Sequence, residues 1–334
     1  MMDYEIFKGV VAEKFSGYLP EKYRDMNIEI RPVEKVNRVL DGLSVLDKEK
    51  GVQISPTIYI NHMYEDYVST GDLNETLMRA AENYDRAMQH NIKVNANEIM
   101  DGEKAKDKII FQLINTEQNR EMLKDMPHRE FKDLSVIYRM VVDINGERMA
   151  SAPVRGAMAD SLGFTEEQLF KLAAENTKRL LPPVIRSMDE VIRSIFEKDG
   201  MPAEIADAMI GSLQPEQQMY VISNKSGING AASMLYEDGL HDLAERIGTD
   251  LYILPSSIHE VIAISSDIGD PESLAALVAE VNMNEVSLDE RLSNQVYHYD
   301  KDIRKVTLAT DTPNKRLDGI VSELPMVYDS GKNR

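Results

Sequence analysis

Residues 165–176 read TEEQLFKLAAEN, and residues 72–83 read DLNETLMRAAEN. The two segments align without a gap, from a residue that can cap a helix (Thr165 or Asp72) to an asparagine. A weaker third copy, DPESLAALVAEV, occupies residues 270–281. Alanine, leucine and glutamate are strong helix formers, so each copy predicts a helix that begins just after its first residue. The shared position of the cap favours a duplicated module over chance similarity.

An apolar, strand-like stretch precedes these helices. We therefore predict an α+β fold in which strand–strand–helix modules repeat on mixed sheets. Pro56 lies in the stretch before the first copy and limits that strand to the edge of a sheet. Glu75 and Gln168 stand three residues after the caps, which indicates capping boxes. Asparagine is a poor helix former, so Asn83 and Asn176 each predict a side-chain partner, on the backbone rather than on a ligand.

The domain organisation follows from length and from one polar segment. The chain has 334 residues, of which 43% are hydrophobic and 28% are charged, enough for a sizeable core. The segment QHNIKVNANEIMDGEKAK, at residues 89–106, marks a module boundary. We predict an N-terminal α+β module at residues 1–100, a larger α+β module at residues 107–310 and a loose C-terminal tail at residues 311–334.

Composition limits the class of protein. There is no cysteine, which excludes a disulfide framework, a thiolate metal site and a cysteine nucleophile. The net charge is −19, opposite in sign to that of a protein that binds phosphate backbones unspecifically. We expect a soluble, cytoplasmic protein without a secretion signal, a membrane span or direct nucleic-acid binding. An acidic mimic of a nucleic acid is an alternative, although 38 basic residues are interspersed with the 57 acidic ones.

Familiar catalytic and cofactor signatures are absent from the sequence. It contains no GxxxxGK[ST], GxGxxG, GxSxG or HExxH motif. The six histidines lie far apart, and none forms a close pair at metal-ligand spacing. His259 and Glu260 are followed by an apolar run, so a zinc-binding helix pair cannot form there. We therefore predict no cofactor, no metal site and no catalytic residue that can be assigned from a motif.

One constellation, near residues 217–254, stands above the rest. A strand-like segment at residues 217–223, a helical segment at residues 229–247 and a second strand at residues 251–254 together read as a βαβ unit. If the two strands are parallel and lie in one sheet, their C-terminal ends meet at the same edge. Ligand crevices of α/β sheets lie at such an edge.

Two loops, residues 223–230 and 255–260, would share that edge. Glycines, free N–H groups and a lysine at the start of a helix can receive an anion. In the alternative interpretation, the serines are ordinary turn and capping residues, and the histidine makes a structural hydrogen bond. The candidate ligand-binding residues are Asn224, Lys225, Ser226, Gly227, Ser256, Ser257, His259 and Glu260.

These patterns do not identify a reaction. We favour a non-enzymatic binding or regulatory protein with a protein partner, because the chain is acidic and lacks catalytic motifs. Its 19 methionines can also soften a partner-binding surface, although filling a core is the more common role. The alternative is an enzyme or a small-ligand (anion) binder that uses the loops at residues 223–230 and 255–260.

Several stretches of the sequence resemble the motifs of one protein family. They read DGEKAKDKIIFQLIN, MPHREFKDLSVIYR, LAAENTKRLLPP, MYVISNKSGINGAASMLY, AERIGTDLYILPSSIHEVI and VSLDERLSNQVYHYD. They are similar to the uncharacterised clostridial family known as domain of unknown function 5688, over nearly the whole chain. The resemblance implies a cytoplasmic bacterial protein, and it carries no activity and no catalytic residue. The family has Tyr-Pro-Gly where this chain has Tyr236-Glu237-Asp238-Gly239, which affects only a break in the helix.

Overall fold

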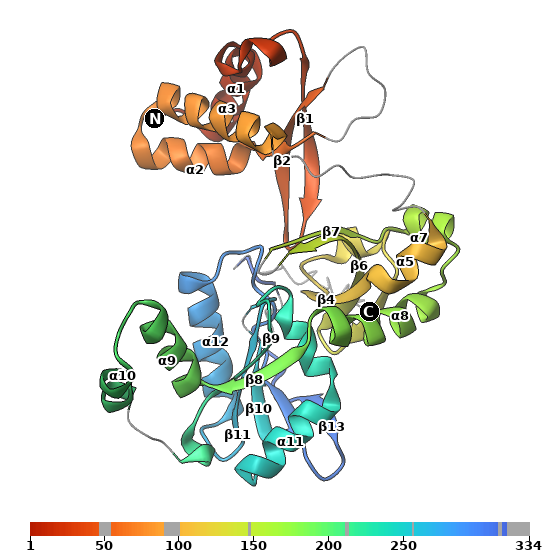
Figure 1. The fold of residues 1–334 in the computed structure, drawn as a ribbon, viewed down its shortest axis with the longest axis vertical. Coiled ribbons are helices and arrows are strands. Elements are labelled where there is room, and N and C mark those ends of the chain that lie inside the picture. Colours follow the sequence, from red (N-terminus) through yellow and green to blue (C-terminus); the bar gives the residue numbers. More distant parts are fainter. Residues whose placement is uncertain are drawn as a thin grey trace, which may run out of the picture. The chain divides into compact units, whose positions relative to one another are not determined.

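The computed structural model describes residues 1–46, 55–89, 101–145, 148–210, 214–255, 257–312 and 316–318. The chain forms two compact units, Met1–Ala96 and Asn97–Arg334, each with its own sheets and hydrophobic core (Figure 1). Helices and strands are both abundant in each unit, so the predicted α+β class is confirmed.

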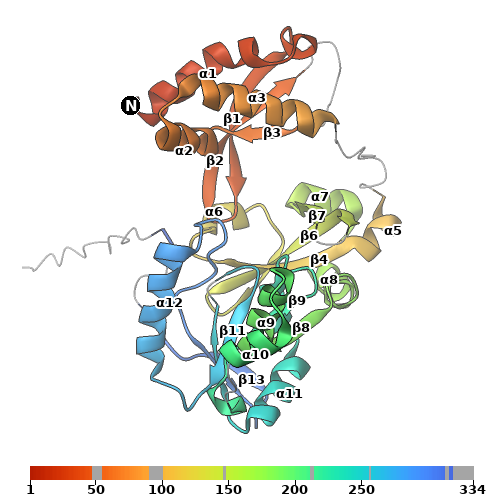
Figure 2. The same cartoon turned by 60° about the vertical axis from the view of Figure 1, so that its left-hand side comes forward.

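In the first unit, helices α1, α2 and α3 pack against an antiparallel sheet of order β1–β2–β3 (Figure 2). The elements are α1 (Tyr4–Tyr18), η1 (Glu21–Tyr23), β1 (Asn27–Lys35), β2 (Arg38–Leu46), β3 (Thr57–Tyr59), α2 (Ile60–Thr70) and α3 (Leu73–Gln89). The strand predicted around Pro56 is β3, which begins directly after the proline. It lies at the edge of the sheet, as predicted.

The core of the first unit follows from apolar spacing along α1. Phe7, Val11 and Phe15 recur every four residues and therefore share one face of the helix. All three are fully buried, in one cluster with Leu43 of β2 and Leu77 of α3. A face with this spacing is stabilised chiefly by burial of apolar surface against the sheet.

The second unit contains a four-stranded and a six-stranded sheet with helices around them (Figure 1). Its first half comprises α5 (Gly102–Ala105), η2 (Lys106–Lys108), β4 (Ile109–Asn115), α6 (Arg120–Leu123), β5 (His128–Phe131), β6 (Leu134–Asn145), β7 (Arg148–Pro153), α7 (Gly156–Leu162) and α8 (Glu166–Leu180). Its second half comprises β8 (Pro183–Ser187), α9 (Met188–Lys198), α10 (Ala203–Ile210), η3 (Pro215–Gln217), β9 (Tyr220–Asn224), η4 (Gly230–Leu235), α11 (Glu237–Ile247), β10 (Leu251–Leu254), β11 (Val261–Ser265), α12 (Pro271–Glu285), β12 (Tyr297–Asp300) and β13 (Lys305–Leu308).

The sheets are antiparallel, so the prediction of mixed sheets is wrong in this respect. Every neighbouring strand pair in the described residues runs antiparallel. The order of the larger sheet is β13–β12–β10–β11–β9–β8, and β6 is the central strand of the smaller one. The physical reason is connectivity: short connections join β6 to β7, β10 to β11 and β12 to β13, and a short connection between adjacent strands forms a hairpin.

The predicted βαβ unit is present in a split form. Both β9 and β10 pair antiparallel with β11, so they run in the same direction, and β11 lies between them. The connection from β9 to β10 is not one helix, because η4 and α11 are separated at Tyr236, close to the predicted break. The C-terminal ends of β9 and β10 therefore lie at one edge of the sheet, with the loop that leads into β11 beside them.

The three repeat copies form α3, α8 and α12, each capped by the predicted residue. The side chain of Thr165 accepts from the N–H of Gln168, and the full capping box is present there. Asp72 and Asp270 also accept N–H groups of the first turn. The N–H of Asp72 donates to Thr70 Oγ1 instead of to Glu75, so the reciprocal half of that predicted box is replaced.

A glycine with positive φ precedes each capped helix. These glycines are Gly71, Gly163 and Gly269, with φ of 72°, 72° and 75°. In the first two copies the glycine ends a preceding helix, α2 or α7, which lies between the strand pair and the capped helix. The third copy has no helix at this point and follows the β10–β11 hairpin directly. In all three copies a strand pair precedes the capped helix, with an additional helix inserted in the first two copies. The left-handed conformation at glycine turns the chain into each capped helix.

Helix α8 is fastened to β4 by the polar residues at its C-terminal end. The side-chain amide of Asn176 donates to the carbonyl oxygens of Lys106 (2.6 Å) and Ile109 (3.1 Å), which confirms the predicted backbone partner. The N–H of Phe111 donates to Thr177 Oγ1 (2.9 Å). Asn83, at the aligned position of α3, is exposed instead.

The described part of the predicted loose tail is docked on the second unit. Leu317 is buried, its N–H donates to Gln118 Oε1, and its carbonyl oxygen accepts from Arg291 at 2.6 Å. The N–H of Thr312 donates to Gln295 Oε1 (3.0 Å). These backbone hydrogen bonds to the second unit hold the segment in place. The polar sequence around the segment does not predict them.

Candidate functional site

The structure brings the two candidate loops, at residues 223–230 and 255–260, into direct contact. Ser223 Oγ donates to the carbonyl oxygen of His259 (2.7 Å), and the N–H of Ala231 donates to the carbonyl oxygen of Ile258 (3.2 Å). The N–H of Asn229 donates to Nδ1 of His259 at 3.3 Å. The loops meet because β9 and β10 end at the same edge of the sheet.

Most candidate side chains in the first loop form hydrogen bonds within the loop itself. Asn224 is buried, its amide nitrogen donates to the carbonyl oxygen of Ile228, and its amide oxygen accepts from both the N–H and the hydroxyl group of Ser226. Gly227 has a φ of 68°, and its N–H donates to the carbonyl oxygen of Asn224. Lys225 is exposed, so among these residues it offers the accessible charge.

The second loop contributes one partly accessible group, the imidazole of His259. Ser257 is buried, and its hydroxyl group accepts from the N–H of His259. Because Nδ1 of His259 accepts from the backbone, the neutral ring carries its proton on Nε2, which lies 3.6 Å from Glu290 Oε1. Glu260 is half-buried, and Ser256 lies outside the described residues.

The contact between the loops is close enough to require glycine at residue 230. A Cβ atom there would lie 2.1 Å from Ser223 Oγ and 2.3 Å from the carbonyl oxygen of His259. The polar groups of the two loops therefore bond to one another. This supports the interpretation that the serines and Asn224 stabilise the loops rather than bind a ligand. Lys225 and the Nε2 side of His259 remain at the surface.

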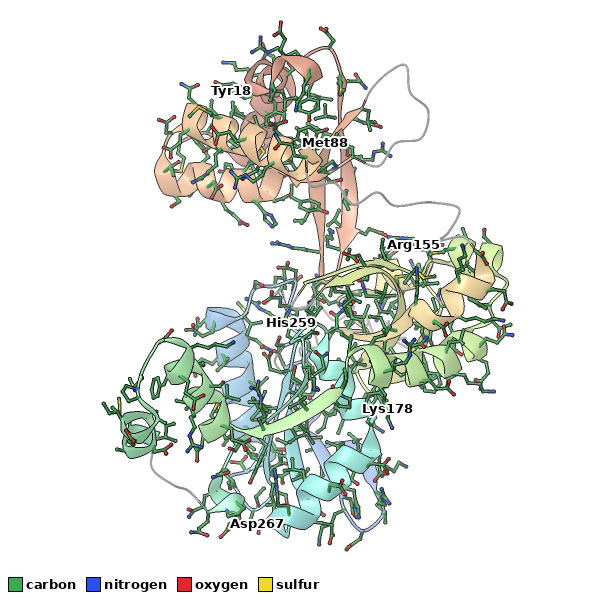
Figure 3. All side chains as sticks on the ribbon, in the orientation of Figure 1. Tyr18, Met88, Arg155, Lys178, His259 and Asp267 are labelled. Carbon is green, nitrogen blue, oxygen red and sulfur yellow. The ribbon has the colours of Figure 1, made fainter. Side chains whose placement is uncertain are left out.

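The second unit also contains a cavity of about 550 Å³ beside α8, referred to below as the α8 cavity. It lies between α8, strands β4, β5 and β6, and the end of η4. Lys178, at its edge, is labelled in Figure 3. The lining residues are Phe111, Arg129, Glu130, Phe131, Val136, Phe170, Ala174, Glu175, Lys178, Leu235 and Tyr236.

Apolar side chains form the walls of the α8 cavity. Phe111 and Val136 are buried, and the rings of Phe111 and Phe170 have centroids 5.2 Å apart. Phe170, Ala174 and Lys178 follow one another at intervals of four residues, so they share one face of α8. The small side chain of Ala174 between the two larger residues leaves the space open.

The guanidinium group of Arg129 lies over the aromatic wall and is neutralised by carboxylates. It stands 3.8 Å from the ring centroid of Phe170, and it donates to Glu166 and Glu167, each at 2.8 Å. The hydroxyl group of Tyr138 also donates to Glu166. Burial favours a higher pKa for Glu166, but the hydrogen bonds from Arg129 and Tyr138 outweigh it, and the pKa is lowered.

Lys178 is an exposed lining residue at the mouth of the α8 cavity, and it lies against Tyr236. The ammonium group of Lys178 lies 4.7 Å from the ring centroid of Tyr236, and the hydroxyl group of Tyr236 donates to the carbonyl oxygen of Ala174 (3.2 Å). Burial raises the pKa of Tyr236 to about 12, so the phenol stays neutral. Lys178 is exposed, and no carboxylate of the described residues forms an ion pair with it.

The sequence does not single out the α8 cavity, because its lining comes from four separate stretches of chain. Only the spacing of Phe170, Ala174 and Lys178 could have indicated a shared face. A smaller cavity of about 310 Å³ lies in the first unit, between β3 and the helices α2 and α3. Within the described residues, no group of three or more histidine, aspartate or glutamate side chains is arranged to hold a metal ion.

The comparisons with known proteins identify a family and carry no activity. Among the described helices, none has both the length and the apolar content that crossing a bilayer requires. A search of curated proteins and a search of solved structures each found no match. The model of a family described as "Family of unknown function (DUF5688)" matches residues 4–301. Because that match covers most of the chain, this protein belongs to the DUF5688 family of unknown function.

Proposed function

We propose that this chain is a binding protein whose α8 cavity takes a small ligand with an apolar, aromatic body and a polar end. The observation that carries the proposal is the cavity itself. Its volume of about 550 Å³ falls within the range of roughly 300–1,000 Å³ that is usual for small-molecule sites. Such sites combine apolar walls with a few polar groups, as this one does.

The walls favour an aromatic ligand. Phe170 and Tyr236 offer ring faces or edges against which a flat apolar body can stack. Arg129 forms ion pairs with Glu166 and Glu167, so its charge is already compensated. Its guanidinium group therefore contacts a ligand mainly as a flat surface over the ring of Phe170. The Arg129–Glu166–Tyr138 hydrogen bonds hold this wall rigid before a ligand arrives, which lowers the entropic cost of binding.

The mouth favours a polar end on the ligand. The ammonium group of Lys178 lies there, while Glu130 and Glu175 also reach the lining. Arg129 is already paired with Glu166 and Glu167, so Lys178 is the lining cation that can orient the polar end, and selectivity rests on the apolar walls. A charge-assisted hydrogen bond at this half-open position adds to affinity without dominating it.

Binding of 1-anilinonaphthalene-8-sulfonate, an aromatic probe with a sulfonate end, tests the proposal on the full chain by fluorescence titration. Ala174→Leu fills the cavity and is expected to abolish probe binding. Lys178→Gln is expected to weaken binding about three- to tenfold, the size of one exposed charge-assisted contact. Lys225→Gln, an exposed lysine in the 223–230 loop, is the matched control and is expected to leave binding unchanged.

Two results would overturn the proposal. One is an affinity that Ala174→Leu does not change. The other is an affinity that falls in Lys225→Gln and not in Lys178→Gln, which would favour an anion site in the loops at residues 223–230 and 255–260. An acidic mimic of a nucleic acid is less well supported, since carboxylates such as Asp41, Glu166 and Glu237 are engaged by basic side chains.

A further inference from the structure

The two edges of the sheet in the first unit differ in how they are protected. Along β1 the exposed edge carries charges and a proline, devices by which proteins prevent another strand from pairing with an edge. These residues are Glu29, Arg31, Pro32, Glu34 and Lys35. The other edge, β3, consists of Thr57, Ile58 and Tyr59 and carries no charge.

The hydrogen bonds of β2 show which backbone groups of β3 face outwards. The N–H of Asp41 donates to Asn61 Oδ1 (2.8 Å), and the carbonyl oxygen of Val45 accepts from Ser55 Oγ (3.1 Å). Both groups lie on the side of β2 that faces β3. Backbone groups point the same way at every second residue of a strand, so Leu43, two residues from both Asp41 and Val45, also faces β3. Leu43 therefore bonds to its register partner Ile58.

Thr57 and Tyr59 therefore direct their N–H groups away from β2, towards the open edge. The carbonyl oxygen of Thr57 points the same way, while that of Tyr59 is at the N-cap of α2 and starts that helix. No partner for these outward groups of Thr57 and Tyr59 is found among the described residues. Two N–H groups two residues apart, with a carbonyl between them, are the pattern that an added strand engages.

A groove runs along this edge, with α3 as its opposite wall. It is the cavity of about 310 Å³ in the first unit, and residues of both β3 and α3 line it. Ala80, Asn83 and Ala87 of α3 face it, with Met63 and Tyr84 below. The small alanines allow a backbone to approach the helix closely. The amide of Asn83 offers a donor and an acceptor, the two groups that a peptide backbone requires.

The titratable side chains in the lining already have partners. Asp66 accepts from the guanidinium group of Arg79 at 2.8 Å, and Nε2 of His62 lies 2.9 Å from a guanidinium nitrogen of Arg38, which can only donate. A charged occupant would have to break one of these pairs. An uncharged segment with polar backbone groups fits the lining as it stands.

We propose that β3 binds an extended, uncharged segment of a partner protein, which adds a fourth strand to this sheet. The added strand lies in the groove between β3 and α3. It bonds to Thr57 and Tyr59 on one side and to the amide of Asn83 on the other. This site is in the first unit, so it neither requires nor competes with the α8 cavity.

Amide hydrogen exchange of the free full-length chain tests the orientation of β3 directly. Ile58 is expected to be protected by its bond to β2, whereas Thr57 and Tyr59 are expected to exchange rapidly. Protection of Thr57 and Tyr59 equal to that of Ile58 would overturn the proposal, because it would show that these amides are already bonded.

A phage-displayed library of random heptapeptides, selected on the full-length chain, tests the binding. Thr57→Pro removes one outward N–H without removing a bond to β2, and Thr57→Val is its matched control, which keeps the N–H and the β-branched shape. Ala87→Lys places a long side chain over the groove at an exposed helical position, where it leaves folding intact. We expect enriched peptides to bind Thr57→Pro about three- to tenfold more weakly, because one hydrogen bond is lost. We expect them to bind Ala87→Lys at least about tenfold more weakly, because the lysine side chain clashes with the peptide, and to bind Thr57→Val within about twofold.

Protection of Thr57 and Tyr59 on addition of the enriched peptides would complete the evidence for strand addition. Failure to enrich any peptide would overturn the proposal. So would peptides that bind Ala87→Lys as tightly as the natural chain, because their site would then lie outside the groove. Should Thr57→Pro lower the stability of the unit, Ala87→Lys still decides the question.

Discussion

The hydroxyl group of Tyr297 donates a hydrogen bond to Oδ1 of Asp133, and this bond joins the two sheets of the second unit. Tyr297 belongs to β12 of the six-stranded sheet, and Asp133 lies between β5 and β6 of the four-stranded sheet. Ser293 Oγ donates to the other carboxylate oxygen. Tyr297 is fully buried, and burial together with the charge of Asp133 raises its pKa well above the ordinary value, so the phenol remains a donor.

Tyr297→Phe is expected to destabilise the second unit by about 1–3 kcal/mol, because it leaves a carboxylate oxygen of Asp133 without one of its hydroxyl donors. Urea denaturation followed by circular dichroism measures the change. Tyr252→Phe, on the neighbouring strand β10 and half-buried, is the control and is expected to cost less than about 0.5 kcal/mol. Equal effects of the two substitutions would contradict a special role for the Tyr297–Asp133 bond.

Asn176→Ala and Asn83→Ala compare aligned positions of two repeat copies. Asn176 bonds to two backbone carbonyl groups that lead into β4, so its loss is expected to cost about 1–3 kcal/mol. Asn83 is exposed, and its replacement by a better helix former is expected to be neutral or slightly stabilising. Equilibrium unfolding of both variants tests this difference. A loss of stability in Asn83→Ala as large as that in Asn176→Ala would show that the two positions are structurally equivalent.

The Glu166 carboxylate is expected to make stability depend on pH in the acid range. Its pKa is lowered in the folded protein by hydrogen bonds from Arg129 and Tyr138, so its contribution is present above the ordinary glutamate pKa of 4.5 and is lost as pH falls through the lower, folded value. Glu166→Gln should therefore be less stable than the natural chain at pH 7, with a difference that shrinks below about pH 4.5.

Denaturation curves at a series of pH values check this sign. Glu175→Gln, an exposed carboxylate on the same helix, controls for the general effect of net charge. A difference between Glu166→Gln and the natural chain that grows as the pH falls would contradict the assigned direction of the pKa shift.

Gly230→Ala is expected to destabilise the second unit by about 1–3 kcal/mol or more, because the new Cβ would overlap the carbonyl oxygen of His259, which belongs to the backbone. Gly239→Ala lies inside α11, where the nearest atom is 3.4 Å from the new Cβ, and is expected to be neutral or to stabilise by up to about 1 kcal/mol. Thermal unfolding distinguishes the two. A tolerated Gly230→Ala would mean that the loops are not closely packed.

Local signals in the sequence account for much of the fold. The caps Asp72, Thr165 and Asp270 begin helices as predicted, because an N-cap depends on groups within four residues of it. The strand predicted around Pro56 lies at an edge as expected, although the proline itself precedes β3, which begins at Thr57. The parallel direction of β9 and β10 is also predicted, since a helical connection between them returns the chain to the same side of the sheet.

The antiparallel pairing required the tertiary structure. Nothing local to β9 or β10 indicates that β11 lies between them, because strand neighbours are chosen by packing over the whole sheet. For the same reason, Asn224 and Ser226 look like ligand-binding residues in the sequence but form hydrogen bonds within their own loop in the structure.

What the sequence alone determined was therefore the set of helices and strands, their caps and the acidic character of the chain, because these depend on residues a few positions apart. What only the tertiary structure decided was which surfaces are open. The α8 cavity joins Phe111, Arg129, Phe170 and Tyr236 from separate elements, and the free edge at Thr57 depends on hydrogen bonds made by the neighbouring strand. Cavities and open edges are what remains after distant segments have packed, so no local pattern records them.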